Sequence, residues 1–283
     1  SLRGAKYGLG LGTLARGTFR LLMAGMAILA LLLLARVAGL GQPAGDQGEI
    51  ADETWKRIQE EGVLRVGLDA SFPPFEFREV DGGPLLGYDI ALARELGKRL
   101  GIEVEFVEVG FDGLYDALYT GQFDAIISSL PYDPLLTKDF AYSYTYFTAG
   151  QVLVVSSREE RTRGKWDLKG KVVGVEYGSD GDVEARRLSR GFAFDLRLFT
   201  TGHEALLALR RGEVEAVLTD AVTAYQFIGR QGGVKIIGEP LTHDPSYVIA
   251  MRPDSQLLLR QINEVLEGMR ADGTLEKLIQ EWF

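Results

Sequence analysis

Two side chains that could recognise a charged ligand, Asp69 and Phe72, follow the apolar run at residues 63–68. That run is predicted to be a buried strand. Pro73 and Pro74 cannot donate to a strand ladder, so the chain has to leave the sheet there. A carboxylate can pair with a cation, and the face of an aromatic ring offers apolar area and a cation–π attraction. Because open α/β sheets bind ligands at the carboxyl ends of their strands, we expect a ligand site at this edge.

The composition argues against several other kinds of site. The chain has 283 residues, of which 46% are hydrophobic and 25% charged, an ordinary globular balance with enough length for one or two domains. The first 40 residues carry five basic residues and no acidic one, so the remainder has a net charge of −14 within a total of −9. An acidic body without basic clusters argues against nucleic acid as a partner. With no cysteine and only His203 and His243 as histidines, we expect no disulfide, no thiolate or histidine-rich metal site and no cofactor.

The amino-terminal segment has the pattern of an export signal. Residues 21–35 form an unbroken apolar or small run that basic residues precede. A bilayer span needs about 20 such residues, so this run fits the hydrophobic region of a signal peptide, with small residues at 37–39 for cleavage. An uncleaved anchor through 19–40 is the alternative. We therefore expect residues 1–40 to be a signal peptide or membrane anchor, and the body to be exported to the periplasm or another extracytoplasmic space.

Strands alternate with helices after a Gly/Pro/Gln-rich linker at residues 41–50. The predicted strands are 63–68, 104–107, 125–128, 150–156, 171–175, 196–199, 216–218, 234–237 and 247–251. The predicted helices are 51–61, 89–100, 111–120, one that follows 178–181 and ends at 190, 204–211, 221–231, 255–271 and 274–282. This alternation is typical of an α/β fold with mostly parallel sheets. The rhythm is interrupted near 150 and 246, which suggests two lobes joined by two crossovers.

Eight segments of the body carry a recognisable pattern when they are taken together. In chain order they are LRVGLDASFPPFEF (64–77), GYDIALARELGKRLG (87–101), FDGLYDAL (111–118), GQFDAIIS (121–128), YSYTYFTAGQVLVV (142–155), DLKGKVVGVEYGSDG (167–181), EVEAVLTD (213–220) and ADGTLEKLIQEWF (271–283). Each is weak alone, but in this order the chain from about residue 63 resembles the amino-acid type of periplasmic solute-binding protein, the receptors of ABC importers (extracellular solute-binding protein family 3).

The resemblance implies a type II periplasmic binding protein-like fold, in which two α/β lobes joined by two hinge strands close on a ligand. Lobe 1 would comprise residues 51–150 plus 246–283, and lobe 2 residues 151–245. It also implies a monomer that binds an amino acid, polar or basic, and delivers it to an ABC permease in the membrane.

The site in lobe 1 would consist of strand ends and loops. Phe72 and Phe111 match the aromatics that sandwich the ligand side chain in the family, and Asp69 matches a position that often contacts its polar or cationic end. The loop whose backbone holds the α-amino and α-carboxylate groups corresponds to Ser128, Ser129, Leu130 and Pro131. The alternatives are that the two phenylalanines are core residues and that Asp69 caps a strand end.

The site in lobe 2 would consist of a helix start and a second acid. Ser179, Asp180 and Gly181 stand where exposed N–H groups and the helix dipole favour an anion such as a carboxylate. Asp220 matches the family's acid that pairs with the α-ammonium group, and a buried hydrogen-bonded ion pair of this kind is strong and directional.

One departure from the family pattern bears on the ligand. Relatives carry an arginine that clamps the α-carboxylate, whereas Leu135 and Leu136 occupy both candidate positions here, and Pro131 replaces the usual threonine. Losing such a guanidinium from a desolvated site costs about 3–5 kcal/mol unless another group replaces it. Lys138 is a candidate replacement, although it lacks the planar fork of arginine. The ligand is then either a polar or basic amino acid or an amine without an α-carboxylate.

An enzyme and a membrane-tethered sensor are the competing classes of protein. A few members of this fold are dehydratases, which need a positioned acid or base. Asp69, Glu76, Glu176 and Asp220 are the candidate acids, but a binding or surface role suffices for each. We therefore expect a binding protein and no catalysis. A sensor would need the anchor at 19–40 to remain uncleaved.

Overall fold

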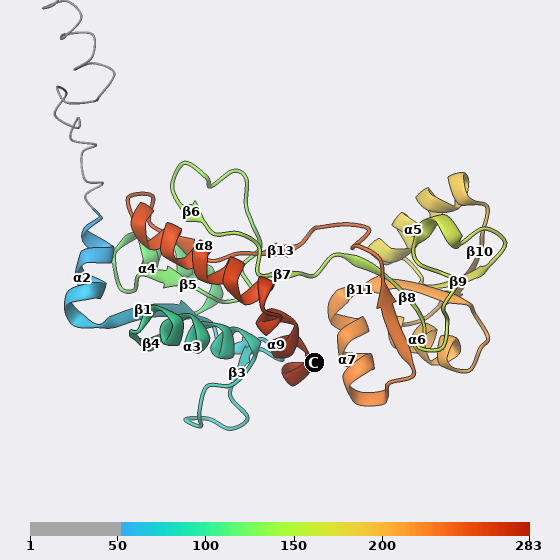
Figure 1. Ribbon diagram of the computed structural model, residues 1–283, viewed down its shortest axis with the longest axis horizontal. Helices are drawn as coiled ribbons and strands as arrows, with labels where there is room; N and C mark the ends of the chain where they lie inside the picture. Colours follow the sequence, from blue (N-terminus) through green and yellow to red (C-terminus); the bar gives the residue numbers. More distant parts are fainter. Residues whose placement is uncertain (1–51) are drawn as a thin grey trace, which may run out of the picture. The chain divides into compact units, whose positions relative to one another are not determined.

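Two five-stranded sheets organise residues 52–283, the part of the chain that the computed structural model describes (Figure 1). The predicted signal peptide or anchor at 1–40 and the linker at 41–50 lie outside the described residues. Within 52–283, none of the helices has the length and apolar character that a membrane crossing requires.

The first sheet carries the predicted ligand edge. Its strand order is β4 (Glu103–Glu108), β1 (Val63–Leu68), β5 (Ala125–Ile126), β14 (Ala250–Met251) and β6 (Ala141–Tyr142). The strands β4, β1 and β5 are parallel, whereas β14 runs antiparallel to both of its neighbours. Because the three parallel strands point the same way, the segments that follow β1 and β5 meet at one edge of the sheet.

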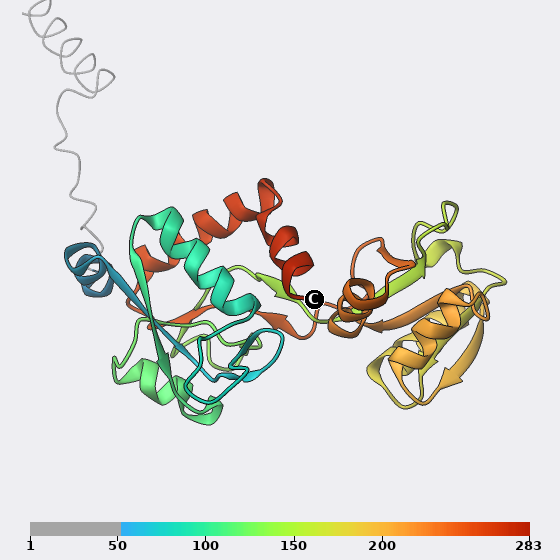
Figure 2. The ribbon, with the colours of Figure 1, turned by 90° about the horizontal axis from the view of Figure 1, so that it is seen from below.

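Helices cover both faces of the first sheet (Figure 2). They are α2 (Glu53–Glu61), α3 (Tyr88–Leu100), α4 (Leu114–Tyr119), α8 (Gln256–Ala271) and α9 (Thr274–Trp282). On one face, Val66 of β1 packs with Leu96 of α3 and Leu266 of α8 in a fully buried cluster. On the other face, Leu118 of α4 packs with Ile126. The sheet is therefore clamped between two apolar layers, which fixes the strand ends that carry the site.

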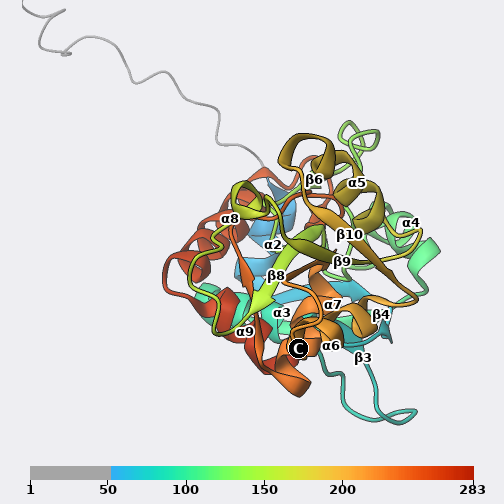
Figure 3. The same cartoon turned by 90° about the vertical axis from the view of Figure 1, so that its right-hand side faces the viewer.

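The second sheet is built in the same way. Its order is β10 (Asp195–Phe199), β9 (Val172–Glu176), β11 (Ala216–Asp220), β8 (Gln151–Ser156) and β12 (Val234–Ile237). The helix α5 (Asp180–Phe192) covers one face, and α6 (Gly202–Arg210) and α7 (Ala221–Gln231) cover the other (Figure 3). We refer to the first sheet with its helices as lobe 1 and to the second as lobe 2; the boundaries at 150 and 246 stay predictions.

The chain passes between the sheets along two paired segments. The short strands β7 (Phe147–Thr148) and β13 (Ser246–Tyr247) form an antiparallel pair. Directly before β8, a Cβ atom on Gly150 would lie 2.0 Å from the carbonyl oxygen of Thr242. Since real side chains do not approach this closely, the two crossing segments require glycine at position 150.

Three predicted elements differ from the structure. The expected strand at 247–251 is two strands, β13 and β14, which pair in different sheets. The expected strand at 125–128 ends at Ile126. The segment after β1, predicted only to leave the sheet, contains a hairpin of β2 (Ser71–Phe72) and β3 (Glu76–Phe77). Between β13 and β14 the Ile249 N–H donates to the Ser143 hydroxyl at 2.9 Å, a side-chain partner in place of a neighbouring strand.

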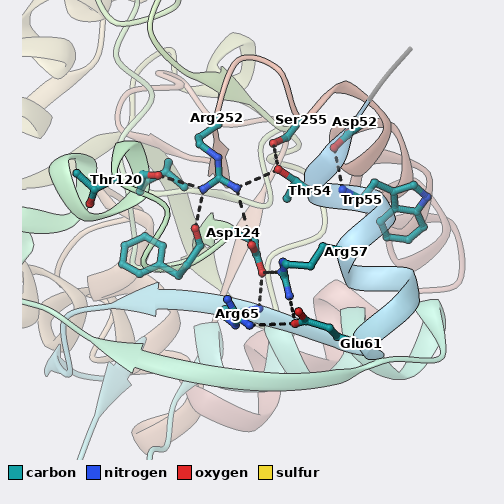
Figure 4. A network of polar contacts seen from close by, with 12 residues as sticks. Asp52, Thr54, Trp55, Arg57, Glu61, Arg65, Thr120, Asp124, Arg252 and Ser255 are labelled. Atoms are coloured by element: carbon teal, nitrogen blue, oxygen red, sulfur yellow. Dashed lines mark hydrogen bonds and ion pairs between the residues drawn. The ribbon is translucent and has the colours of Figure 1, made fainter. Parts of the chain in front are cut away.

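A polar network fastens α2 to the end of the first sheet opposite the ligand edge (Figure 4). The carboxylate of Asp124 accepts from the Arg65 N–H at 2.9 Å and pairs with the Arg57 guanidinium. Arg252 donates to the Phe123 carbonyl at 2.9 Å and lies 3.9 Å from Asp124. Because the side chain of Asp124 is only 4% exposed, these charges stabilise one another in place of water.

Candidate functional site

A cavity of about 320 Å³ opens at the predicted edge of the first sheet. Its lining residues are Asp69, Ser71, Phe72, Glu76, Phe111, Ser128, Ser129, Pro131 and Tyr247. The volume lies within the range of cavities that hold small molecules. The structure therefore brings six of the predicted site residues of lobe 1 together, with Leu130 as the exception.

Asp69 connects the loops that form the cavity. Its carboxylate accepts a hydrogen bond from the Phe111 N–H at 2.8 Å, and its own N–H donates to the Ser128 hydroxyl at 3.0 Å. The capping role that the sequence left open is thus present in the structure. The same side chain also lines the cavity, so it can hold Phe111 in position and face a ligand.

The two phenylalanines are not core residues. Phe72 is 47% exposed and Phe111 46% exposed, although both are large apolar side chains. Phe72 stacks on the buried ring of Phe75, with 5.6 Å between centroids and 6° between planes. One face of the Phe72 ring therefore packs on Phe75, while the exposed part of the ring offers a surface for an apolar or cationic ligand group.

Two buried carboxyl groups lie next to one another at the cavity: Glu76 lines it, and Asp89, which does not, is hydrogen-bonded to the lining residue Ser129. Glu76, on β3, and Asp89, in the first turn of α3, are each 1% exposed. Ser128 donates its hydroxyl to Glu76 at 3.0 Å, and Tyr146 donates its hydroxyl to Asp89 at 3.0 Å. Burial, followed by the charge of Asp89, raises the pKa of Glu76 to about 10. Burial also raises the pKa of Asp89, to about 6, against the hydrogen bonds that it accepts.

The approach of α3 to the β2–β3 hairpin places these two acids together. The hairpin carbonyls of Pro74 and Phe75 accept from the first N–H groups of α3, those of Tyr88 and Asp89, at 2.9 and 2.8 Å. A Cβ atom on Gly87, whose φ is 124°, would lie 2.1 Å from the Phe75 carbonyl oxygen. Glycine at this position therefore allows the helix start to rest against the hairpin.

The loop after β5 is held in an unusual conformation. Ser129 has a φ of 44°, which is rare for a residue other than glycine. Its N–H donates to Asp89 at 2.5 Å, and this buried hydrogen bond holds the conformation. Leu130, the next residue, is 2% exposed, packs in the core of lobe 1, and its carbonyl accepts from Val248. Leu130 does not line the cavity, so its contact with a ligand stays a prediction.

The predicted residues of lobe 2 occupy helix starts and do not line this cavity. Ser179 caps α5 by accepting from the Asp182 N–H, and Asp180 and Gly181 are the first residues of that helix. Asp220 caps α7 by accepting from the Thr223 N–H at 2.8 Å. That the start of α5 receives an anion and that Asp220 pairs with an ammonium group stay predictions, and each of these residues has a structural role as well.

The bacterial extracellular solute-binding proteins, family 3, match residues 64–283 of this chain. The chain belongs to this family. The L-cystine-binding protein TcyJ of Escherichia coli is 30% identical over 260 residues, which cover 91% of this chain and 94% of that protein. The family and the two-lobed, mostly parallel α/β fold, both predicted from the sequence, are confirmed.

Two solved structures of ancestral proteins are similar to this solute-binding protein. One is an ancestral cationic amino acid solute-binding protein, with 35% sequence identity, 81% of this chain and 99% of that chain covered and a TM-score of 0.55. The other is an ancestral cyclohexadienyl dehydratase, with 26% identity, 82% and 96% covered and a TM-score of 0.72. Both a binding protein and an enzyme thus share the fold, and the family is one of binding proteins.

Among the described residues of this solute-binding protein, those that line the cavity include no lysine or arginine. Leu135 is 85% exposed, and Leu136 packs against the apolar cluster beneath the loop. Lys138 is exposed and does not line the cavity, so nothing in the structure supports it as a replacement for the missing arginine. The acidic side chains in the cavity lining are those of Asp69 and Glu76.

Three cavity residues were not predicted as ligand contacts. Ser71 lies in the hairpin that the sequence did not reveal, and Glu76 was considered only as an acid for catalysis. Tyr247 reaches the cavity from β13, which is distant in sequence. No local sequence signal indicated that Glu76 would be buried at the cavity.

Proposed function

We propose that this chain is the ligand receptor of an ABC importer and binds an amino acid with a polar or basic side chain, a basic one preferred. One observation carries the preference: the cavity is lined by two carboxyl groups and two exposed phenylalanines and by no basic side chain. A cationic group can pair with the Asp69 carboxylate, can donate hydrogen bonds to the Glu76 carboxyl group and is attracted by the ring faces. The L-cystine-binding and ancestral cationic amino acid-binding relatives support an amino acid as the ligand.

Lobe 2 completes the site when the protein closes. The start of α5 at Ser179, Asp180 and Gly181 supplies N–H groups for the α-carboxylate, and Asp220 pairs with the α-ammonium group. A ligand that bridges both lobes stabilises the closed state relative to the open one. The closed protein then delivers the amino acid to the permease as an exported monomer.

A ligand screen tests this function. Unfolding temperature is measured with each amino acid, with polyamines and with quaternary amines, followed by titration calorimetry of the positive ligands. A ligand present at about a thousand times its Kd stabilises the folded state by about 4 kcal/mol, so arginine or lysine should raise the unfolding temperature by several degrees. Aspartate and glutamate should not. A screen in which acidic amino acids bind best would contradict the proposal.

An amine without an α-carboxylate is the second candidate ligand. The absence of basic residues from the described cavity lining favours it, because a carboxylate would meet no cation there. Arginine and agmatine, which differ by that carboxylate alone, separate the two. Arginine binds more tightly if the start of α5 receives the carboxylate, and agmatine binds at least as well if it does not.

Catalysis is not part of the proposal, although a dehydratase shares the fold. Prephenate and arogenate are the substrates to assay, with product measured over many turnovers. We expect no product. Sustained product formation would show that the protein is an enzyme and would contradict the receptor function. Intact-mass measurement of the exported protein tests the tethered-sensor alternative, because cleavage near residue 40 removes the anchor.

A further inference from the structure

The two buried acids, Glu76 in the cavity lining and Asp89 beside it, have fewer hydrogen-bond donors than two carboxylates need. Four donors reach them: the hydroxyls of Ser128, Ser129 and Tyr146 and the N–H of Ser129. Three of these reach the same oxygen, Oδ2 of Asp89, and the other oxygen, Oδ1, is buried without any partner. An unpartnered buried carboxylate oxygen is costly, so a further donor is expected at this position.

The single hydroxyl hydrogen of Ser129 cannot satisfy both acids. Its Oγ lies 3.2 Å from Oε2 of Glu76 and 3.4 Å from Oδ2 of Asp89. A serine hydroxyl donates one hydrogen bond at a time. Whichever way the hydroxyl turns, one of the two carboxyl groups therefore lacks a hydrogen-bond donor. A proton on one of the acids supplies the missing donor.

No basic group compensates the pair in the described part of the chain. The groups that act on the two acids are each other, the serines and Tyr146. From the other packed elements, Tyr88 of α3 and Tyr247 of β13 face the pair, and burial raises the pKa of both tyrosines, so they stay neutral. Two adjacent buried carboxyl groups without a cation cannot both be ionised near neutral pH.

We propose that Glu76 and Asp89 share one proton in the ligand-free protein, and that a cationic ligand group docking against Glu76 expels this proton into solution. Glu76 carries the proton towards Asp89, whose unpartnered oxygen accepts it as a hydrogen bond. When a guanidinium or ammonium group reaches Glu76, its N–H groups replace the shared proton as donors, and the O–H bond breaks with the proton passing to solvent. This inference rests on the proposed preference for a basic ligand.

Because a cationic ligand group exchanges with this proton, the site distinguishes charged from neutral ligand side chains. A neutral side chain leaves the proton in place and meets an uncharged carboxylic acid, whereas a cation meets a carboxylate. Because cation binding releases one proton, the affinity for a cation rises with pH by as much as about tenfold per pH unit while the free pair stays protonated. The affinity for a neutral ligand of the same shape does not change in this way.

Titration calorimetry of the full chain with arginine and with citrulline tests the proposal. Citrulline has the shape of arginine but an uncharged side chain, and both share the same α-amino and α-carboxylate groups, so protons exchanged by those groups cancel. Enthalpies are measured between pH 6 and 8 in buffers that differ in ionisation enthalpy. Arginine should release about one proton more than citrulline. Equal release for the two ligands, with both bound, would overturn the expulsion of the proton and leave the receptor function intact.

Two variants test whether the released proton comes from Glu76 and Asp89. Glu76→Gln replaces the protonated acid by a neutral amide of the same shape; it should abolish the extra release and reduce arginine affinity much more than citrulline affinity. Asp69→Asn removes the other carboxylate of the same cavity; it should weaken arginine binding and keep the extra release. Release that persists in Glu76→Gln would contradict the assignment.

Infrared spectroscopy of the ligand-free wild type tests the shared proton without a variant. A protonated carboxylic acid has a carbonyl stretch that carboxylates lack. We expect this band at pH 7 and its loss on adding arginine. A spectrum without the band at pH 7 would overturn the shared proton. If none of the amino acids or amines binds, the receptor proposal fails, and the expulsion step fails with it.

Discussion

At the scale of single residues, the buried acid in the cavity lining makes stability depend on pH. The pKa of Glu76 is raised to about 10 in the folded protein, chiefly by burial. Between its ordinary pKa and 10, the folded state holds a proton that the unfolded chain has released. Stability must then fall as pH rises through this window, because the unfolded state binds fewer protons.

Glu76→Gln removes this dependence. The free energy of unfolding of the variant, relative to the wild type, should increase by about 1.4 kcal/mol per pH unit from pH 6 to 8, as one proton of difference requires. Urea denaturation at three pH values measures it. The exposed Glu60→Gln is the matched control and should leave the dependence unchanged. A variant whose stability relative to wild type does not vary with pH would show that Glu76 is ionised in the folded state.

How far the residues of the site could be predicted depends on how local their signals are. Asp69 and Phe72 lie between a strand and a double proline, so their place at the sheet edge could be predicted from the sequence. Tyr247 reaches the cavity through a pairing between segments nearly a hundred residues apart, which no local pattern contains. The donor shortage at Glu76 and Asp89 likewise arises only when α3 meets the hairpin.

At the scale of elements, the network behind the ligand edge keeps α2 and the first sheet together. Asp124→Ala should destabilise the protein by about 3–5 kcal/mol, because it leaves Arg57 and the Arg65 N–H without their buried partner. Glu213→Ala breaks an exposed ion pair with Arg211 and should change the stability far less, because water screens such pairs. Denaturant unfolding compares the two variants. Equal losses would mean that Asp124 is no more than a surface partner.

The crossing segments between the sheets give a second test at this scale. In Gly150→Ala the new Cβ would lie 2.0 Å from the Thr242 carbonyl oxygen, so the two segments must separate. We expect a loss of about 2 kcal/mol or more in unfolding free energy and weaker ligand binding. Gly164→Ala is the control, since a Cβ there meets nothing within 4 Å. If both variants unfold at the same denaturant concentration, the crossing tolerates a side chain.

The helices and long strands were predictable from the sequence because their apolar periodicity and glycine stops are local. The strand predicted at 247–251 was wrong as a single element for the opposite reason. Its residues are uniformly apolar, but its first half pairs with β7 and its second with β5 and β6. An apolar pattern predicts that residues are buried, but it does not predict which sheet they join.

At the scale of the whole molecule, the proposed mechanism has residues of lobe 2 meet a ligand held in lobe 1. Asp220 is the test of this step, because its carboxylate caps α7 and is also the predicted partner of the ligand ammonium group. Alanine would remove both roles. Asparagine caps a helix about as well as aspartate, so Asp220→Asn removes the charge and keeps the cap.

We expect Asp220→Asn to unfold at nearly the wild-type denaturant concentration and to bind arginine at least about thirtyfold more weakly. Removing one member of a buried, hydrogen-bonded charge pair costs about 2–5 kcal/mol. Asp220→Ala should bind as weakly and also lose about 1 kcal/mol of stability through the missing cap. Calorimetry and urea denaturation of the two variants separate these effects. Wild-type affinity in Asp220→Asn would restrict this residue to capping, and ligand recognition would then belong to the carboxyl groups of lobe 1.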